Sequence, residues 1–408
     1  MRDSGTVTEF DAIIVGSGIA GLGCARKLHD LGFCNFLVIG DELGGRIPVS
    51  TDGQVNYGAF YVRSDYRNFL PYVTLKRRIS TADVVVMPNG HRLNGNQIPN
   101  WRTWWQRLRF WWFLRRFARR YQDFRIRSER MSQKKAMDAD PWLKSLFREP
   151  ARDLVGRLNL GAWTETHLEP LVCSTAFRRI DEVSSGYFAA CCLPLIIPTY
   201  EFEFQLEKLI SPFFSRLLRQ TVTMVEASAI GSGWMVTTES GETFSARNLV
   251  LATPMNVTRT LVAITEDTNP PSSAYMVHVR GTLRPKFRER SIFMFPATES
   301  EIGLVHEANE TVLLYSRRAS PDLSRYFENY EVIARRHWDP AFFIGTEILE
   351  ADRGDGLYLI GDHNVCSIED AMISGMYVAR CLCAADQESP GERPAQSHTP
   401  LAAADLGD

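Results

Sequence analysis

The sequence predicts an α/β protein, and three observations lead to this fold class. Residues 10–16 form a short apolar run that ends in glycine, and a helical pattern from Ile19 to Leu31 follows it directly. Residues 35–39 form a second apolar run, so the chain opens with strand, turn, helix and strand. Near the other end, residues 356–361 have the pattern of a buried strand, and a helix is expected from Ser367 to Leu382.

The composition is typical of a globular protein with a complete core. The chain has 408 residues, of which 45% are hydrophobic and 23% charged. The formal net charge of −2 gives no overall attraction to nucleic acid, so we expect no nucleic-acid partner. The eight cysteines form no CxxC pair and no metal-ligand spacing, which predicts reduced thiols and no metal site. Neither a signal peptide nor a long apolar span is visible, so we expect a cytoplasmic protein.

The turn after the first strand carries the pattern GxGxxG, as Gly16-Ser17-Gly18-Ile19-Ala20-Gly21. In this pattern the first glycine permits the tight turn and the second lets the backbone approach a pyrophosphate. The third, Gly21, lets the helix pack closely on the strand. The helix N-terminus then offers N–H groups and a positive dipole end to phosphates. The pattern with its flanking elements therefore predicts a dinucleotide-binding site.

The acidic residue that normally ends the second strand and binds ribose hydroxyls is displaced in this chain. Gly40 stands at the expected position, and Asp41 follows it. In one interpretation Asp41 takes this role after a shift of one residue. In the other it is a solvated turn residue, and both interpretations stay open.

Four further motifs distinguish between classes of dinucleotide-binding protein. They are Gly44-Gly45-Arg46, the run Asn56-Tyr57-Gly58-Ala59-Phe60-Tyr61, the stretch from Leu249 to Pro254, and the pair of segments Gly356–Asp362 and Ser367–Gly375. In this order and spacing they resemble the flavin-containing amine oxidase and phytoene desaturase superfamily. The match covers the cofactor half of the chain in three separated pieces.

This resemblance implies a noncovalently bound FAD in a Rossmann-like domain of the glutathione-reductase type. It implies that Gly44, Gly45 and Arg46 lie along the pyrophosphate and flavin, and that Gly58, Ala59 and Tyr61 line the isoalloxazine. It assigns the adenine contact to Val225 or Val222, and the ribityl–pyrophosphate region to Gly361 and Asp362. Ile368 would open a helix aimed at the flavin C2 carbonyl, where the helix dipole stabilises the negative charge of a reduced flavin.

The chain also departs from the pattern of the amine oxidases. Cys366 has no covalent attachment motif around it, and Cys366-Ser367 stands where an aromatic residue often frames the flavin. The segment 274–280 has no lysine, and we expect its polar residues His278 and Arg280 to be ordinary strand residues. These differences favour a dehydrogenase, a desaturase or an atypical oxidase over a standard amine oxidase.

No catalytic triad or carboxylate dyad is visible in the sequence, which fits chemistry carried by a cofactor. Tyr61, inside a matched motif, and His363, directly after the Gly361-Asp362 turn, are the catalytic candidates. For His363 a structural role stays open as the alternative. The aromatic residues that we consider for the substrate pocket are Trp163, Tyr187, Phe188, Tyr200, Phe202, Trp338, Phe342 and Phe343.

Residues 101–127 predict an unusual helix. The stretch from Trp101 to Arg130 holds five of the nine tryptophans, and its arginines far outnumber its acids. The tryptophans recur at helical spacing, which is typical of a helix lying in a membrane interface. In the alternative interpretation the aromatic side chains pack on the substrate domain and the arginines face solvent.

Together these patterns predict two domains. Residues 1–75, 205–265 and 345–385 form the FAD-binding domain, 76–204 and 266–344 form a mixed α+β substrate domain, and 386–408 form a disordered tail. The predicted function is two-electron oxidation of a small or lipophilic molecule by hydride transfer to flavin N5, with oxygen or a quinone as electron acceptor. The alternatives are an amine or amino-acid oxidase, a redox-neutral isomerase or cyclase, and a noncatalytic flavin-bound interaction protein.

Overall fold

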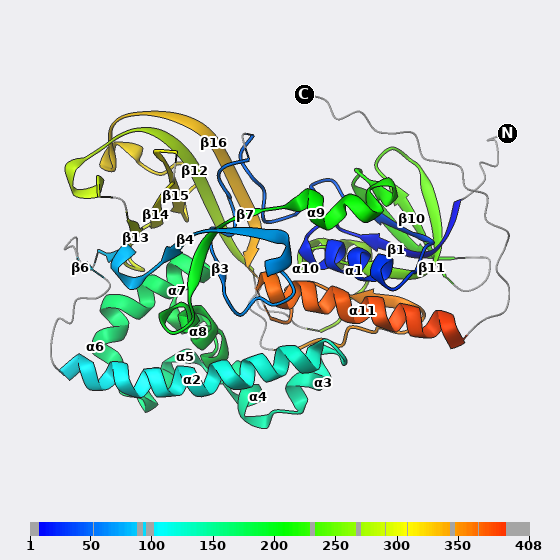
Figure 1. Ribbon diagram of the computed structural model, residues 1–408, viewed down its shortest axis with the longest axis horizontal. Helices are drawn as coiled ribbons and strands as arrows, with labels where there is room; N and C mark the ends of the chain where they lie inside the picture. Colours follow the sequence, from blue (N-terminus) through cyan, green and yellow to red (C-terminus); the bar gives the residue numbers. More distant parts are fainter. Residues whose placement is uncertain are drawn as a thin grey trace.

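A computed structural model describes residues 8–51, 53–87, 93–94, 102–228, 233–266, 271–289, 291–307, 309–342, 347–365 and 367–388. Two bodies of different composition lie side by side in Figure 1. One holds a twisted sheet with two long helices against it, and the other holds a larger sheet above a layer of helices. The long final helix, α11, runs between the two bodies.

The first sheet has the strand order β8-β2-β1-β11-β10-β9. Strands β8 (Leu217–Leu218), β2 (Phe36–Ile39), β1 (Thr8–Val15) and β11 (Thr243–Leu251) are parallel. The Gly-containing turns within 221–251 predict a meander of three strands, and β9 (Val222–Ala227), β10 (Trp234–Thr238) and β11 form one, with antiparallel pairs. β17 (Leu357–Leu359) pairs in parallel with the last residues of β11. Chain segments far apart in the sequence therefore complete one sheet.

Two helices cover one face of this sheet. Helix α1 (Ile19–Asp30) connects β1 to β2, and α11 (Ile368–Glu388) packs against it. The contact is close because a Cβ on Gly375 would lie 2.1 Å from the Ala20 carbonyl oxygen. α11 continues three residues into the tail predicted to be disordered from residue 386, and residues 389–408 lie outside the described part of the chain.

The second sheet has the order β16-β12-β15-β14-β13-β5-β6. Its strands are β16 (Phe327–Phe342), β12 (Ser272–Leu283), β15 (Thr311–Ser316), β14 (Glu301–His306), β13 (Ile292–Met294), β5 (Val84–Val86) and β6 (Leu93–Asn94). The residues at 274–284 and 291–316 have strand patterns, and β12, β13, β14 and β15 form there. The edge strand β16 is not among the predictions, because most of its side chains are exposed or half-buried and no apolar alternation marks it.

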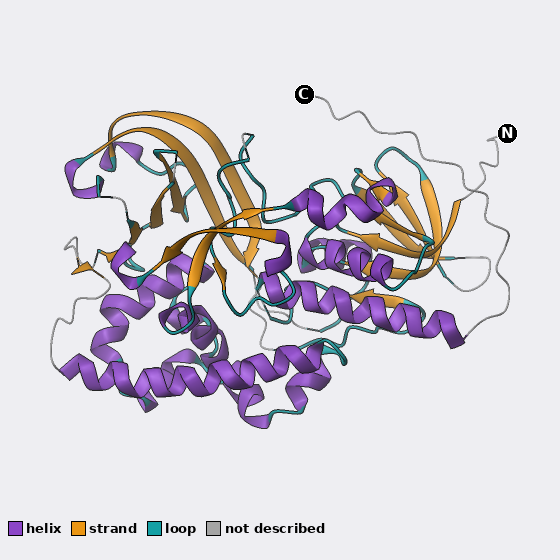
Figure 2. Ribbon diagram, viewed as in Figure 1, coloured by secondary structure: helices purple, strands orange, loops and turns teal. Residues whose placement is uncertain are grey.

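A small third sheet, β3-β7-β4, lies near the junction of the two bodies (Figure 2). Its strands are β3 (Val62–Arg63), β7 (Thr199–Phe204) and β4 (Val73–Ile79). The apolar pattern of residues 140–210 predicts mostly helix, and this prediction is wrong for β7. The sequence TYEFEF alternates from Tyr200 onward, so Phe202 and Phe204 are buried on the same face as the half-buried Tyr200.

Helices form the layer beneath the second sheet (Figure 2). They are α2 (Arg102–Ser128), α3 (Gln133–Asp138), α4 (Pro141–Arg148), α5 (Ala151–Arg157), α6 (Gly161–Trp163), a π-helical turn (Thr164–Leu168), α7 (Glu169–Ala176) and α8 (Ser185–Cys192). Shorter helices α9 (Leu206–Ile210) and α10 (Met255–Leu261) belong to the first body.

The buried stripe of α2 is made of phenylalanines and not of tryptophans. Phe110, Phe117 and Phe124 are fully buried in the helical core. Trp104, Trp105 and Trp112 are 49%, 55% and 62% exposed, so the interpretation in which the tryptophans pack on the substrate domain is wrong for these three. Trp101 lies outside the described residues. Among the described helices none is long and apolar enough to span a membrane.

Candidate functional site

The fingerprint turn joins β1 to α1 with little space between backbone atoms. Gly16 has φ +111°, a conformation that L side chains rarely adopt. A Cβ on Gly21 would lie 2.0 Å from the Gly16 carbonyl oxygen, so only glycine lets α1 approach the turn this closely. α1 starts after Gly18 with no side-chain cap and no acidic residue in its first turn. Its first N–H groups are therefore available to an anion such as a phosphate.

The second glycine loop folds directly onto this turn. Gly44 N donates to the Ser17 carbonyl at 2.9 Å, and Gly18 and Gly44 form a parallel bridge. A Cβ on Gly45, where φ is +60°, would lie 2.9 Å from the Gly18 Cα. The structure thus brings together the two segments that sequence motifs predict for the pyrophosphate.

The displaced acidic residue has a steric explanation. A Cβ at position 40 would lie 2.5 Å from Ser17 Oγ and 2.6 Å from Ser17 N, so an aspartate or glutamate would not fit there. Asp41 follows in an exposed turn, where its Oδ1 accepts a hydrogen bond from Glu42 N at 2.8 Å. Its role at a ribose stays a prediction.

Residues predicted to line a flavin converge from three distant segments. A Cβ on Gly58 would lie 1.9 Å from the Arg46 carbonyl oxygen, so the Gly58-Ala59 segment lies against the backbone of Arg46. The Arg46 guanidinium forms an ion pair with Asp362 at 2.7 Å and donates to the Ala341 carbonyl at 3.1 Å. Arg46 therefore connects the glycine loop both to the β17–α11 turn and to the second sheet.

The turn between β17 and α11 holds His363 in a buried position. Gly361 has φ +137° and starts the turn. His363 is 6% exposed, and its Nε2 has no hydrogen-bond partner in the described part of the chain. Burial lowers the pKa of His363 to about 4, so its imidazole is neutral at pH 7. A buried polar atom without a partner fits a position where a cofactor supplies the partner.

The first turn of α11 is anchored by a buried acid. Glu369 is 1% exposed, and its carboxylate accepts hydrogen bonds from the backbone N–H groups of Asn68 and Phe69 at 2.9 and 3.0 Å. Burial raises the pKa of Glu369. Because these bonds connect α11 to the loop after β3, they fix where the helix begins at Ile368. Its contact with a flavin carbonyl stays a prediction.

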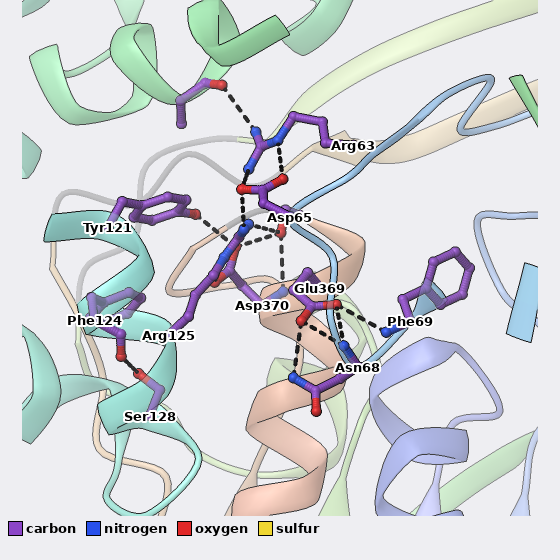
Figure 3. Close-up of polar contacts among 12 residues, drawn as sticks. Arg63, Asp65, Asn68, Phe69, Tyr121, Phe124, Arg125, Ser128, Glu369 and Asp370 are labelled. Atoms are coloured by element: carbon purple, nitrogen blue, oxygen red, sulfur yellow. Dashed lines mark hydrogen bonds and ion pairs between the residues drawn. The ribbon is translucent and has the colours of Figure 1, made fainter. Parts of the chain in front are cut away.

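A buried ion-pair network supports the same helix start from below (Figure 3). Arg125 of α2, whose side chain is 2% exposed, donates to Asp370 at 3.0 and 2.8 Å and to Asp65 at 2.9 Å. Asp65 also accepts two hydrogen bonds from Arg63, at 2.9 and 3.0 Å. Tyr121 adds a hydroxyl bond to Asp370 at 2.6 Å. The network joins α2, α11 and the loop after β3 into one unit.

Reading the sequence alone missed this network. One local signal was present, since Ser367 and Asp370 form the Ser-x-x-acid pattern of a helix start. In the structure Asp370 N donates to Ser367 Oγ at 3.0 Å. The long-range partners Arg125 and Asp65 have no such signal, because they lie far away in the sequence.

The predicted adenine contacts lie in β9, the edge strand of the first sheet. Val222 and Val225 are both buried in its core. Val222 is the nearer to β8 in the chain, and the Leu218 carbonyl of β8 accepts a hydrogen bond from Gly40 N at 3.1 Å. That Val222 or Val225 contacts the adenine stays a prediction.

A cavity of about 260 Å³ lies on the substrate side of the Gly58–Tyr61 segment. Phe60 and Tyr61 form one part of its wall, and α2 forms another with Arg107, Phe110 and Trp111. Other lining residues are Ile79, Ser80, Thr81, Val84, Val86, Leu114, Trp163, His167, Leu168, Leu171, Thr175, Pro194, Leu195, Ile196, Thr199, Ile292 and Met294. The wall is mostly apolar, as is typical of a small-molecule site.

The catalytic candidate Tyr61 lies in this wall. Its hydroxyl is hydrogen-bonded to the Thr175 side chain, and burial raises the pKa of Tyr61. Tyr61 is therefore a neutral phenol at pH 7, and its catalytic role stays a prediction. His278 lies in the second sheet, bonded to the Tyr57 hydroxyl at 3.2 Å and to Thr311 at 2.6 Å.

The aromatic pocket candidates have mixed placements. Trp163 lines the cavity, whereas Tyr187 and Phe188 belong to the helical core and Phe202 to the core of the first body. Phe342 packs on Phe177 at 5.7 Å. Tyr200 and Trp338 are half-buried, and Phe343 and Cys366 lie outside the described residues. In the described part of the chain no group of three or more metal-ligating side chains is found.

Comparisons with known proteins agree with this architecture. The family model for an NAD(P)-binding Rossmann-like domain matches residues 14–74. A double mutant of putrescine oxidase is 14% identical with a TM-score of 0.64, over 92% of this chain and 99% of that one. Cyclohexylamine oxidase from Brevibacterium oxydans is 14% identical with a TM-score of 0.62, over 94% and 100%. A CLA-producing fatty acid isomerase from P. acnes is 12% identical with a TM-score of 0.69, over 91% and 98%.

The N-terminal segment is thus a Rossmann-like dinucleotide-binding domain. The fold of the whole chain is similar to that of putrescine oxidase, cyclohexylamine oxidase and the fatty acid isomerase. At these identities the likeness concerns the fold alone. No curated protein sequence matches the chain significantly.

Proposed function

We propose that the chain binds FAD noncovalently and is an oxidoreductase that removes two electrons from a small or lipophilic organic molecule. The observation that supports this most is a continuous set of contacts around one site. Gly45 touches Gly18 at the uncapped start of α1, and Arg46 touches both Gly58 and Asp362. These contacts connect a phosphate-binding turn to the mouth of an apolar cavity, as a dinucleotide with a reactive ring requires.

In this proposal each part of the chain has a limited task, because FAD when bound accepts a hydride at N5. The start of α1 holds phosphate oxygens, and the start of α11 favours negative charge on the ring. Tyr61 and the apolar wall position the substrate and keep water away. Oxygen or a quinone is the electron acceptor that we propose.

The first test is the visible absorbance spectrum of the purified protein, with chromatography of the cofactor released by heat. We expect flavin bands near ~370 and ~450 nm and free FAD in the supernatant. A protein that releases NAD(P), or that stays colourless after incubation with FAD, would overturn the cofactor proposal.

The reaction class is tested separately, because related folds carry different reactions. The solved neighbours are named as amine oxidases and as a fatty acid isomerase. We propose dehydrogenation or desaturation over amine oxidation. Anaerobic mixing with amines and with unsaturated acids measures which class bleaches the flavin. Product formation without bleaching or an acceptor would indicate the redox-neutral isomerase or cyclase, and bound flavin that no compound reduces would indicate a noncatalytic protein.

A second proposal concerns the exposed side of α2, which we propose lies on a membrane surface rich in anionic phospholipid. Trp104, Trp105 and Trp112 stand exposed there, beside exposed arginines such as Arg115 and Arg116. Tryptophan favours the interface, and arginine attracts anionic headgroups. The opposite side of α2 lines the cavity, so the same helix would connect the membrane with the substrate site.

Co-sedimentation with vesicles tests this surface. We expect binding to vesicles that contain phosphatidylglycerol and much weaker binding to vesicles of phosphatidylcholine alone. The double variant W104S/W112S should lose most of the binding, whereas Tyr330→Ser, which removes an equally exposed aromatic from β16, should keep it. Equal binding of both variants would contradict the proposal.

A further inference from the structure

Among the described residues, the charged and polar side chains that line the cavity include a cation and no carboxylate. Arg107 is the cation of the wall, and the other polar side chains are hydroxyls, an indole and an imidazole. None of the lining residues in the described part of the chain carries a carboxylate. A positively charged ligand would therefore meet the Arg107 charge and no carboxylate of the described cavity lining, which costs free energy in a partly desolvated site.

A π-helical turn supplies two buried polar atoms to this wall. Residues Thr164–Leu168 form the turn just before α7, and π-helical turns occur frequently at functional sites. Pro170 contributes to the irregularity, because it has no N–H for a helical hydrogen bond. His167 lies in the turn and Trp163 directly precedes it, and each is 7% exposed.

Both of these side chains have a polar atom without a hydrogen bond in the described part of the chain. The indole Nε1 of Trp163 has no partner, and the same holds for Nε2 of His167. His167 uses its other nitrogen, Nδ1, in a 2.7 Å hydrogen bond with Thr166. The Thr166 hydroxyl donates to the Trp163 carbonyl, so the neutral His167 donates through Nδ1 and its Nε2 is an acceptor. The indole N–H is a buried donor without a partner in the described part of the chain, which is rare and costly, so a ligand that accepts a hydrogen bond is its simplest partner.

Arg107 lies at the same end of the cavity as these two groups. Its guanidinium sits 5.3 Å from the centre of the Trp163 ring. Burial lowers the pKa of Arg107, and burial followed by the Arg107 charge lowers the pKa of His167 to about 4. The imidazole is therefore neutral at pH 7, and the remaining positive charge belongs to the guanidinium.

From this arrangement we propose that the cavity binds a lipophilic monocarboxylate, with its carboxylate held by Arg107 and the Trp163 N–H, beside the neutral imidazole of His167. The apolar tail then lies along Phe110, Trp111 and Leu114 and points toward Tyr61. The guanidinium supplies the charge, and the indole N–H supplies a directional bond. A diamine, the ligand class that the name putrescine oxidase indicates for that protein, has the wrong charge for this wall.

This assignment deepens the proposed function, because it names the substrate class of the same site. Its test is a binding measurement that does not depend on flavin reduction. Isothermal titration calorimetry of the purified protein compares octanoate, octan-1-ol and octylamine, which share a chain length and differ in the head group. We expect octanoate to bind about tenfold or more tighter than octanol, and octylamine to bind weakest.

Variants then identify the residues that read the carboxylate. Arg107→Gln should weaken octanoate about tenfold or more and leave octanol unchanged, whereas Arg107→Lys should preserve the preference for the acid over the amine. Trp163→Phe keeps the ring and removes the N–H, so a smaller loss is expected. Arg119→Gln, an exposed arginine on the same helix, is the matched control and should bind octanoate normally.

Two outcomes would overturn the assignment. One is octylamine binding as tightly as octanoate, and the other is Arg107→Gln weakening octanol and octanoate equally. A failure of the flavin test is distinguishable from both: octanoate binding with the head-group order above would survive in a protein that holds no FAD. Conversely, a yellow protein that prefers octylamine would keep the cofactor proposal and reject this one.

Discussion

Replacing Arg125 by methionine tests the ion-pair network beneath α11. The guanidinium is 2% exposed and makes two hydrogen bonds to Asp370, which is 1% exposed, and one to Asp65. Its removal leaves the Asp370 carboxylate buried without its counter-charge. Breaking a buried pair in this way typically costs ~3–5 kcal/mol. Because Tyr121 and Ser367 still bond to Asp370, we expect Arg125→Met to lower the free energy of unfolding by about 3 kcal/mol, the lower end of this range.

The assay is urea unfolding followed by far-UV circular dichroism, with Arg120→Met as the matched control. Arg120 lies on the same helix and pairs with Asp140 at 2.7 Å, but its side chain is 40% exposed. Asp140 is 6% exposed, but Leu143 N still donates to its carboxylate and water reaches the Arg120 end of the pair, so the control should shift the urea midpoint less than Arg125→Met. The double variant R125M/D370N removes both charges and should recover more than half of the loss. Equal shifts for Arg125→Met and Arg120→Met would refute the reasoning.

Two further predictions concern the glycine turn and pH. Gly21→Ala places a Cβ 2.0 Å from the Gly16 carbonyl oxygen, so this variant should purify without cofactor. Gly156→Ala lies in an open position of α5, so it should keep the cofactor and raise the free energy of unfolding by up to about 1 kcal/mol. Visible absorbance measures the cofactor, and the urea midpoint measures the stability. His363 has its pKa lowered to about 4 by burial, so the unfolded chain takes up its proton first as the pH falls below ~6.5. The His363 contribution to the free energy of unfolding should therefore fall by about 3 kcal/mol between pH ~6.5 and ~4, so His363→Asn should lose about that much less stability than the wild-type protein over this interval. Identical pH profiles of the variant and the wild-type protein would contradict this.

The exposed tryptophans of α2 show how far a periodic pattern can be interpreted. Their spacing predicts a helix correctly, because i, i+3 and i+4 positions share one side of it. The spacing alone does not determine which side of the helix is buried, however. The phenylalanines at 110, 117 and 124 repeat with the same period, and they took the buried side. Only packing against α4, α6 and α8 decided between the two stripes.

The edge strand β16 and the Arg125 network were not predictable for a related reason. β16 is held by backbone pairing with β12, and its exposed, charged side chains have no apolar alternation. Arg125 looks like any other arginine in a helix rich in them. Its burial depends on Asp65 and Asp370, which come from distant parts of the chain.

By itself the sequence determined the features that depend on local backbone geometry. Gly16, Gly21 and Gly58 are glycines because a Cβ or a negative φ would not fit, and that requirement is visible wherever the motif is. Tertiary structure alone decided what the loops enclose: the Arg46–Asp362 pair and the cavity with Arg107, Trp163 and His167. The physical reason is that local conformation is restricted by neighbouring residues, whereas the burial and pairing of a charge depend on segments that folding brings together.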